Sequence, residues 1–342
     1  MTAPKLRISV ALCTYNGSRF LPEQLASIAA QTRLPDEMVV CDDGSSDATP
    51  EIVTEFGKTA SFPVRFFRNP KNLGSTKNFE QAIGLCTGDL IALCDQDDIW
   101  LPEKLARQAE MMERDPTLGG IFSDAELIDQ NSRLIGKQLW RLGSFTTSRQ
   151  KSFRAGKGAS VLLNRNVVAG ATLMVRANLR AQWLPIPQPW HHDGWIAWML
   201  LLYSKLEFDQ NQLIMYRLHE NQQTGVPLLQ SLRLTLGERL ANGKREEPAK
   251  YLARARELEI LHQLLVSRRD PRSQAVLPAL RQAIRFFSDC GTPYENYLLR
   301  ISRILRNTWN YQRYENGWKS LIRDLVLMFV PLDDPPQRAV GK

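Results

Sequence analysis

Short blocks of hydrophobic and polar residues alternate along the first 130 positions of the chain. Residues 7–13 place Ile8, Val10 and Leu12 on one face and small residues on the other, which is typical of a buried β-strand. Residues 20–31 instead repeat hydrophobic residues at helical spacing. The two patterns then recur, predicting strands at 38–41, 64–67 and 90–94, and helices from Pro50 (capped by Thr49), at 75–86 and at 101–114. This alternation predicts an α/β fold whose mainly parallel sheet is covered by helices on both faces.

The pattern is weaker in the middle of the chain. The polar, glycine-containing stretch at 136–165 is expected to form long connections, and three prolines predict a loop at 182–193. Hydrophobic runs around that loop predict a strand at 167–175, a helix at 195–204, and one or two strands within 206–216.

From about Leu228 onward, leucine and arginine recur at helical spacing and the strand pattern fades. We therefore expect two domains, at 1–227 and 228–342, of which the second is helical. Turns within the second domain are expected near 242–243, Pro271 and Pro293.

The charge is unevenly distributed between these two parts. Residues 1–229 contain 24 basic and 24 acidic side chains, whereas residues 230–342 contain 20 basic and 12 acidic ones, a surplus of eight that equals the formal net charge of +8. An anionic membrane surface fits this excess. Packing against the first domain and an oligomerisation surface are the alternatives, and nucleic acid is not expected because no recognition module is present.

Composition places the chain among ordinary globular proteins. Hydrophobic residues make up 43% and charged residues 23% of its 342 positions, which excludes a disordered or fibrous chain. The longest apolar runs, such as 325–332, fall far short of the ~20 residues that a membrane-spanning helix needs, and the N-terminus lacks the apolar core of a signal peptide. Five cysteines without paired spacing favour a reduced, cytoplasmic protein, attached at most peripherally to the inner face of the cell membrane.

Polar and acidic residues follow three of the predicted parallel strands, at 14–17, 42–47 and 95–98. The carboxyl ends of parallel strands share one edge of a sheet, where ligands bind. A dinucleotide site would need a glycine-rich turn after the first strand, and Asn16-Gly17 is followed by no second glycine, so we reject that site. A Walker-type phosphate loop is absent as well.

Asp95, Asp97 and Asp98 form an acidic cluster at this edge. Their carboxylates repel one another unless a cation lies between them. Hard oxygen ligands suit Mg²⁺ or Mn²⁺, which commonly bind substrate phosphates as well. The alternative is an acidic turn that caps the helix beginning near Leu101. The position after a buried strand, beside a second acidic strand end, favours the cation.

Four ordered motifs resemble the family 2 glycosyltransferases with the GT-A fold: 10–16 (VALCTYN), 39–47 (VVCDDGSSD), 72–74 (NLG) and 94–100 (CDQDDIW). The last motif, with 216–219 (YRLH), is similar to the rhamnosyltransferase-like branch. The resemblance covers about residues 6–225. It implies transfer of a sugar, rhamnose by analogy with that branch, from a dTDP- or UDP-sugar donor. The acceptor would be a glycan or lipid-linked glycan in cell-surface polysaccharide synthesis.

The resemblance also implies roles for the motif residues. Thr14, Tyr15 and Asn16 would line the base and ribose, and Asp43 would accept a hydrogen bond from the base, with Asp42 supporting the loop. Asp95, with Gln96 beside it, would approach the ribose or the sugar. Asp97 would be the main cation ligand, while Asp98 would lie nearby or cap the next helix. Lys77 would contact the nucleotide, unless it is a solvated helix residue.

Transfer to a hydroxyl also requires a base. Asp193, within 190–195 (WHHDGW), fits the catalytic acidic motif of the family. That motif is commonly Glu-Asp, whereas here His192 precedes the aspartate, the form seen in rhamnosyltransferase-like members. Asp193 could instead cap a helix starting near Trp195. A metal site of Asp193 with His191 and His192 is disfavoured because adjacent histidines point in different directions.

These expectations describe an inverting, metal-dependent glycosyltransferase in which His219 is a further cation ligand, or else a surface histidine on a loop. One competing function is a nucleotidyltransferase that makes sugar nucleotides, but the glycine-rich basic loop usual in such enzymes is missing after the first strand. The other is a non-catalytic membrane- or glycan-binding protein on a degenerate transferase fold. The intact set of acids argues against it.

Overall fold

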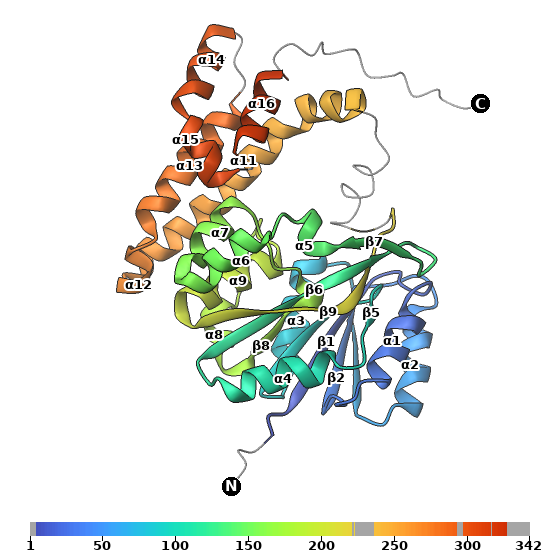
Figure 1. Ribbon diagram of the computed structural model, residues 1–342. Coiled ribbons are helices and arrows are strands. Elements are labelled where there is room, and N and C mark those ends of the chain that lie inside the picture. Colours follow the sequence, from blue (N-terminus) through green and yellow to red (C-terminus); the bar gives the residue numbers. More distant parts are fainter. Residues whose placement is uncertain (1–4, 221, 223–235, 293–296, 316, 327–342) are drawn as a thin grey trace, which may run out of the picture. The chain divides into compact units, whose positions relative to one another are not determined.

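The computed structural model describes residues 5–220, 222, 236–292, 297–315 and 317–326. Contacts divide the chain into two compact units (Figure 1). The first unit comprises residues 1–162 and 166–226, and the second comprises residues 163–165 and 227–342. No helix within the described ranges combines the length and the apolar character that crossing a membrane requires.

A nine-stranded sheet forms the centre of the first unit (Figure 1), with the strand order β3-β2-β1-β4-β8-β6-β9-β5 and with β7 paired to β6. The strands are β1 (Ile8–Thr14), β2 (Glu37–Asp42), β3 (Val64–Arg68), β4 (Leu90–Asp95), β5 (Ile99–Trp100), β6 (Leu118–Ile128), β7 (Leu134–Gln138), β8 (Met174–Arg176) and β9 (Lys205–Arg217). The first four strands are mutually parallel. β8 lies antiparallel between β4 and β6, and β9 runs parallel to β6.

Helices cover both faces of this sheet. Those of the first unit are α1 (Leu21–Ala29), α2 (Thr49–Thr59), α3 (Ser75–Leu85), α4 (Lys104–Arg114), α5 (Leu139–Leu142), α6 (Thr147–Ser152), α7 (Gly158–Asn164), α8 (Arg180–Trp183) and α9 (His192–Tyr203). Residues of α1, α2 and α4 join one hydrophobic cluster with Ile8, Val10 and Leu12 of β1. α3 contacts β1, β2 and β4 through buried residues outside that cluster. The predicted α/β fold with a mainly parallel, helix-flanked sheet is therefore confirmed.

The structure departs from the predicted elements mainly after residue 115. β6 was not predicted, because its sequence contains two glycines and the polar pair Ser123 and Asp124. Both polar residues are nevertheless buried, and Asp124 Oδ1 accepts a hydrogen bond from the Trp140 amide (2.9 Å). Gly120 is needed because a Cβ there would overlap the Leu200 side chain. The chain thus fills a buried strand with residues that local propensity disfavours.

Three smaller predictions were also wrong. The stretch 136–165 is not a long connection, since it contains the end of β7, three short α-helices and a π-helical turn at Phe153–Lys157. The strand expected at 167–175 shortens to β8 behind a 3₁₀ turn at Gly170–Thr172. Thr49 does not cap α2 but is its first residue. Its hydroxyl and amide both donate to Asp47 Oδ1, so Asp47 stabilises this helix start instead.

The described part of the second unit is helical, as predicted. It contains α11 (Leu236–Arg268), α12 (Pro271–Gln274), α13 (Leu277–Gly291), α14 (Tyr297–Arg306), α15 (Thr308–Tyr314) and α16 (Trp318–Val326). The turn expected near 242–243 is wrong, because α11 continues through it and through Pro248. Leu258, Leu261 and Leu265 of α11 are fully buried, and this helix packs on α13. Tertiary packing therefore outweighs the helix-breaking residues. The turn predicted near Pro293 lies outside the described residues.

Candidate active site

The ends of β1, β2 and β4 bring three sequence motifs to one edge of the sheet. Thr14 lies opposite Asp42 in the parallel ladder of β1 and β2, and Cys13 lies opposite Asp95 in that of β1 and β4. The three polar strand ends are therefore neighbours, in the place where parallel α/β sheets bind ligands.

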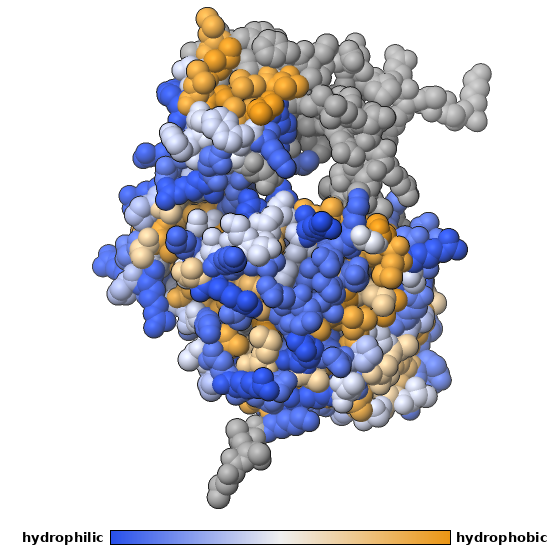
Figure 2. Space-filling model, viewed as in Figure 1, coloured by the Kyte–Doolittle hydropathy of each residue, from blue (hydrophilic) through white to orange (hydrophobic). Residues whose placement is uncertain are grey.

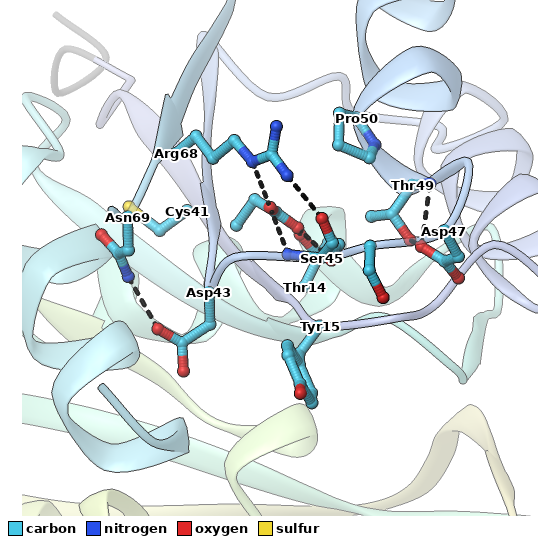
Figure 3. Close-up of polar contacts among 12 residues, drawn as sticks. Thr14, Tyr15, Cys41, Asp43, Ser45, Asp47, Thr49, Pro50, Arg68 and Asn69 are labelled. Atoms are coloured by element: carbon cyan, nitrogen blue, oxygen red, sulfur yellow. Dashed lines mark hydrogen bonds and ion pairs between the residues drawn. The ribbon is translucent and has the colours of Figure 1, made fainter. Parts of the chain in front are cut away.

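Asp42 is fully buried and holds the loop after β2. Its Oδ1 accepts a hydrogen bond from the Thr14 hydroxyl (2.9 Å), and its Oδ2 accepts one from the Ser45 amide (2.9 Å). The Arg68 guanidinium lies 3.6 Å from the same carboxylate and also donates to the Ser45 carbonyl (Figure 3). These contacts join the ends of three strands. Thr14 and Asp42 therefore support the site from inside the protein.

Asp43 points the other way, toward the segment that precedes α3. Its Oδ1 accepts hydrogen bonds from Asn69 Nδ2 (2.9 Å; Figure 3) and the Leu73 amide (2.8 Å), and its Oδ2 accepts one from the Gly74 amide (2.9 Å). Gly74 has a φ of 83°, which favours glycine. A carboxylate has about four acceptor positions, so this contact set leaves Asp43 room for one further donor.

Asn16 connects the loops after β1 and β2. Its backbone is left-handed, with a φ of 47°. Its amide donates to Ser45 Oγ (2.9 Å), and its side-chain Oδ1 accepts from the Ser46 amide (2.8 Å). Asparagine is one of the few residues that adopt this conformation readily. Asn16 thus fixes the direction in which the neighbouring Tyr15 ring leaves the loop.

Tyr15 is exposed, with 48% of its surface accessible. Its backbone is clamped by Gln96, whose Oε1 accepts from the Tyr15 amide (2.8 Å) and whose Nε2 donates to the Tyr15 carbonyl (3.0 Å). A Cβ at Gly17 would overlap the Gln96 side chain, so the glycine permits this approach. Gln96 therefore braces the loop that presents Tyr15.

Three carboxylates from distant parts of the sequence influence one another electrostatically. Burial, followed by the charges of Asp97 and Asp193, raises the pKa of Asp95 to about 8. Asp95 ends β4 and Asp97 follows it, whereas Asp193 belongs to α9. The fold thus brings the acidic strand end and the predicted base into one electrostatic neighbourhood.

Asp97 and His219 are in direct contact. Asp97 Oδ2 lies 2.8 Å from His219 Nε2, and both side chains are nearly buried, with 13% and 9% of their surfaces exposed. The Phe20 ring lies against the imidazole, with 4.7 Å between ring centroids. Two ligands about 2.1 Å from a cation, in neighbouring octahedral positions, lie about 3 Å apart. This oxygen and nitrogen therefore have a spacing that fits one Mg²⁺ or Mn²⁺ ion, although no group of three or more ligating side chains gathers among the described residues.

Arg217 holds the Asp97 and His219 segments together. Its fully buried guanidinium donates to the Asp97 carbonyl (2.6 Å), to Glu23 Oε2 (2.6 Å) and to Ser132 Oγ (2.8 Å). It also lies over the Phe20 ring, 4.7 Å from the centroid. Arg217 therefore pairs with a neighbouring carboxylate and acts as a positioning residue.

Asp98 is fully buried in the protein interior, next to the Arg217 backbone. Its Oδ1 accepts a hydrogen bond from the Arg217 amide (3.0 Å), while its buried Oδ2 has no partner in the described part of the chain. Burial, followed by the charges of Asp97 and Asp95, raises the pKa of Asp98 well above its ordinary value. The capping alternative for this acidic turn is wrong, because α4 begins at Lys104 and its cap residue is Glu103.

Asp193 lies in the first turn of α9, whose cap residue is His191. The helix begins three residues earlier than predicted, so the interpretation of Asp193 as its cap is wrong. Asp193 Oδ1 accepts a hydrogen bond from the Gly194 amide (2.5 Å).

His192 packs away from Asp193, into the interior. Its ring stacks on Phe79, with 4.0 Å between centroids, and lies so close to Gly170 that a Cβ there would overlap it. Burial lowers the pKa of His192 to about 4, so the imidazole is neutral near pH 7. His191 is exposed, and the two histidines therefore point in different directions, as expected.

Lys77 joins α3 to the proline-rich loop that precedes α9. Its ammonium donates to Glu80 Oε2 (2.9 Å) and to the Ile186 carbonyl (3.1 Å), and Glu80 Oε2 also accepts from the Ile186 amide (2.7 Å). Lys77 is therefore half-buried and bonded within the protein rather than solvated. Its predicted nucleotide contact stays a prediction.

Sequence reasoning did not identify Asn69, Ser45 or Glu23 as part of this arrangement. Asn69 follows β3, and its buried amide bridges Asp43 and Asn78 Oδ1 (3.0 Å). Its position at a strand end could have indicated it. Glu23 lies within α1, and its contact with Arg217 spans 194 positions, so no local pattern could have revealed it.

Residues 9–162 match the family described as Glycosyl transferase family 2. Sequence relatives include an uncharacterized glycosyltransferase of Nostoc sp., 28% identical over 63% of this chain and 65% of that protein. The Escherichia coli enzyme UDP-Glc:alpha-D-GlcNAc-diphosphoundecaprenol beta-1,3-glucosyltransferase WfgD is 31% identical over 38% of this chain and 49% of its own length. The matched region thus spans less than two thirds of either relative. Residues 9–162 therefore match the family that the motifs at 10–16, 39–47, 72–74 and 94–100 resemble.

Solved structures resemble the fold over most of the chain. Residues 1–349 of S. aureus TarS in complex with UDP-GlcNAc align with a TM-score of 0.52, covering 94% of this chain and 90% of that one at 18% sequence identity. The same part of TarS in complex with UDP gives a TM-score of 0.50 over 90% and 92% of the two chains, at 17% identity. At this identity the likeness concerns the fold, and it confirms the expected GT-A-type architecture.

Proposed function

We propose that this protein is an inverting, metal-dependent glycosyltransferase that moves a sugar from a nucleoside diphosphate to a hydroxyl group. The observation that carries the proposal is the convergence of Asp95, Asp97 and Asp193 at the strand edge of a glycosyl transferase family 2 domain. Such a cluster suits a reaction in which a diphosphate leaves and a hydroxyl is deprotonated.

The donor nucleotide would lie against the loops after β1 and β2. The exposed Tyr15 ring offers a stacking surface for the base. Asp43 retains acceptor capacity for a donor group of the base, while Thr14, Asn16, Asp42 and Gln96 hold these loops in position. The loops are therefore formed in advance of binding, which lowers the entropic cost of ordering them.

Asp97 and His219 would hold the cation through the oxygen and nitrogen that lie 2.8 Å apart. A bound Mg²⁺ or Mn²⁺ ion would neutralise the charge that develops on the leaving diphosphate. Arg217 keeps the two ligand-bearing segments together, and Glu23 balances the buried guanidinium charge. Asp95, at the end of β4, would approach the ribose or the sugar.

Asp193 would accept the proton of the acceptor hydroxyl. The hydroxyl oxygen forms a bond to the anomeric carbon while the bond between that carbon and the diphosphate oxygen breaks, and the electron pair leaves with the nucleoside diphosphate. A base on the face opposite the leaving group gives inversion at the anomeric carbon. The packing of His192 against Phe79 and Gly170 fixes the start of α9, and thereby the place of Asp193.

The donor and acceptor are proposed at the level of chemical class. The TarS structures contain UDP or UDP-GlcNAc, and the name of WfgD specifies a UDP-glucose donor and a diphosphoundecaprenol-linked acceptor. These proteins support a UDP-sugar donor, and WfgD supports a lipid-linked glycan acceptor; a dTDP-sugar donor and a free glycan acceptor rest on the motifs alone. Transfer of rhamnose remains a prediction from the motifs at 94–100, 190–195 and 216–219.

The test is product formation from a panel of UDP-, dTDP- and GDP-sugars with Mn²⁺ or Mg²⁺. We expect release of a nucleoside diphosphate from one class of donor, slowly to water and faster to an added acceptor. Release of pyrophosphate from a nucleoside triphosphate and a sugar phosphate, without diphosphate release from any donor, would instead identify a nucleotidyltransferase. A protein that binds glycan without turnover would be a non-catalytic binding module.

Asp193→Asn sharpens this test because it removes the base and keeps the shape of the side chain. We expect donor affinity, measured by calorimetry, to stay within about twofold, while turnover falls by about 10²–10⁴-fold. Asp89→Asn is the matched control, since Asp89 lies before β4, at the opposite end of that strand from Asp95. Normal turnover by Asp193→Asn would contradict the assignment of the base.

A further inference from the structure

The last three described helices expose a concentration of large hydrophobic side chains. They carry half of the large hydrophobic residues that are exposed in the described part of the chain, and Figure 2 shows hydrophobic residues gathered over α14. These residues, here named the α14–α16 patch, are Leu298 (74% exposed), Leu305 (63%), Trp309 (85%), Trp318 (60%), Ile322 (55%) and Val326 (40%). Single exposed hydrophobic residues need no explanation, but a concentrated group marks an interaction surface.

The spacing of the patch shows that it consists of helix faces. Trp318, Ile322 and Val326 follow one another at intervals of four along α16, and Leu298 and Leu305 are seven apart in α14. Both intervals return a side chain to the same side of a helix. Because α14 contacts both α15 and α16, the exposed faces belong to one packed group of helices.

The opposite faces of these helices are already used inside the second unit. Tyr311, Tyr314 and Leu321 are buried, and the Tyr311 hydroxyl donates to Asp324 Oδ2 (2.6 Å). The rings of Tyr311 and Tyr314 also pack against Phe286 of α13. The α14–α16 patch is therefore the outer face of helices whose inner faces are buried.

Charge indicates which partner fits this surface. Residues 297–326 contain six basic and two acidic side chains. The two acids bond within the unit: Asp324 is buried, and Glu315 Oε2 accepts from the Ser320 hydroxyl (3.1 Å). Arg306, Arg313 and Lys319 are exposed. The outer surface thus combines tryptophan and leucine side chains with cations, whereas the two acids are bonded within the unit. Such a surface complements an anionic surface that has an apolar interior.

We propose that the α14–α16 patch binds the surface of an anionic lipid bilayer. The tryptophan rings and aliphatic side chains would lie at the headgroup boundary, and Arg306 and Lys319 would contact lipid phosphates. The helices lie on the bilayer rather than across it, because none in the described ranges is long and apolar enough to span. This binding does not depend on the transferase activity proposed above.

The experiment is flotation of the full chain with two kinds of vesicle, one of phosphatidylcholine alone and one containing about a third phosphatidylglycerol. We expect the protein to float with the anionic vesicles and to remain in the dense fraction with the neutral ones. Raising the salt concentration should weaken the binding, because ions screen contacts at a charged surface. Absence of wild-type binding to anionic vesicles would overturn the proposal.

Two variants separate the apolar from the ionic contribution. The double variant Trp309→Ser/Trp318→Ser should lower the partition coefficient at least tenfold, because two interfacial aromatic anchors are lost. Arg306→Gln/Lys319→Gln should lower it about 25-fold at low salt, since each cation near an anionic leaflet contributes about a factor of five. Leu134→Ser in β7 is the matched control, because Leu134 is 64% exposed but lies in the first unit, and it should bind like the wild type.

Sedimentation analysis without lipid distinguishes a second copy of the chain as the occupant. Self-association that the Trp309→Ser/Trp318→Ser variant abolishes, together with absent vesicle binding, would overturn the lipid proposal in favour of a protein interface. Circular dichroism and a thermal melt of each variant identify any loss of folding. If the two tryptophan substitutions unfold the chain, the wild-type protein provides the test instead. Acrylamide should quench its tryptophan fluorescence less after anionic vesicles are added, and unchanged quenching would contradict the proposal.

Discussion

The two halves of the first unit use their acidic residues in different ways. In the half formed by β1 to β4, Asp42 and Asp43 accept hydrogen bonds from backbone amides and neighbouring side chains, and they hold loops. In the half that contains α9 and β9, Asp193 and His219 come close to the acids that follow β4. The acids of the first half therefore hold loops in position, whereas the second half supplies the candidate base Asp193 and the candidate cation ligand His219.

This difference shows that an acidic motif does not by itself identify a chemical role. Asp42 and Asp97 both follow a parallel strand of the same sheet. Asp42 is satisfied by Thr14 and Ser45, whereas Asp97 faces a histidine across 122 positions of sequence. The contacts of the carboxylate, rather than its place after a strand, distinguish a supporting residue from a candidate ligand.

The largest effect is expected for Asp97→Ala, which removes the acid shared by both halves. Without this carboxylate, His219 would be the one proposed protein ligand left to the cation, so we expect turnover to fall at least about 10³-fold. We also expect that EDTA no longer weakens donor binding. Calorimetry of the donor with and without EDTA measures this. Asp36→Asn serves as control because Asp36 precedes β2 at the far end of the sheet. Donor binding that remains EDTA-sensitive in Asp97→Ala would place the cation elsewhere.

Arg217→Met tests the connection between the two halves. The substitution removes three donors from a buried site, leaves the Asp97 carbonyl without its partner and leaves Glu23 with only the Ser132 hydroxyl, so we expect a loss of about 3 kcal/mol in the free energy of unfolding. Urea unfolding of the first unit measures the change. Arg154→Met is the matched control, since Arg154 also lies over a phenyl ring and pairs with Glu207 but is about half exposed. It should cost at most about 1 kcal/mol, and equal losses would refute the special place of Arg217.

Glu37→Gln tests the first half alone, far from the reactive groups. Burial alone would raise the pKa of Glu37, but hydrogen bonds from Thr87, Ser9 and Arg65 outweigh it and lower the pKa from 4.5 to about 2. The charged form therefore stabilises the fold above pH 4.5, and this contribution is lost as the pH falls toward 2.

At pH 7 the Glu37→Gln variant should accordingly be about 2 kcal/mol less stable than the wild type, and the gap should narrow as the pH drops below 4.5. Urea unfolding at a series of pH values gives the curve. Donor affinity at pH 7 should not change. A difference that is independent of pH would show that the carboxylate charge is not the cause.

The smallest effect is expected for Gln96→Ala, which removes the brace on the Tyr15 loop but no group that reacts. Two hydrogen bonds to the Tyr15 backbone are lost, so KM for the donor should rise about tenfold through a less ordered loop, with kcat changed by less than about threefold. Steady-state kinetics separates the two constants. A fall in kcat alone would assign Gln96 to the reacting sugar instead.

The strands of the first half and the helical second unit were predictable because each depends on a regular local pattern. Ile8, Val10 and Leu12 fill one face of β1, and the leucines of α11 recur at helical spacing. β6 could not be predicted this way, since its buried polar residues are satisfied by contacts that no alternation shows: Asp124 accepts from the Trp140 amide, and Ser123 donates to the Asp124 carbonyl. The helices at 139–164 are short, and their hydrophobic residues follow no long repeat.

By itself the sequence determined the α/β class, the polar strand ends at Thr14, Asp42 and Asp95, and the motifs that resemble glycosyl transferase family 2, the family whose model matches residues 9–162. Alternation of residue types and short motifs are local properties, so they can be recognised without knowledge of the fold. Only the tertiary structure decided that Gln96 holds the Tyr15 backbone and that Arg217 joins Glu23 to Asp97. It also decided that Asp193 lies near enough to Asp95 to raise the pKa of that carboxyl. Each of these depends on side chains more than 80 positions apart, whose distance is set by strand order and helix packing rather than by any spacing along the chain.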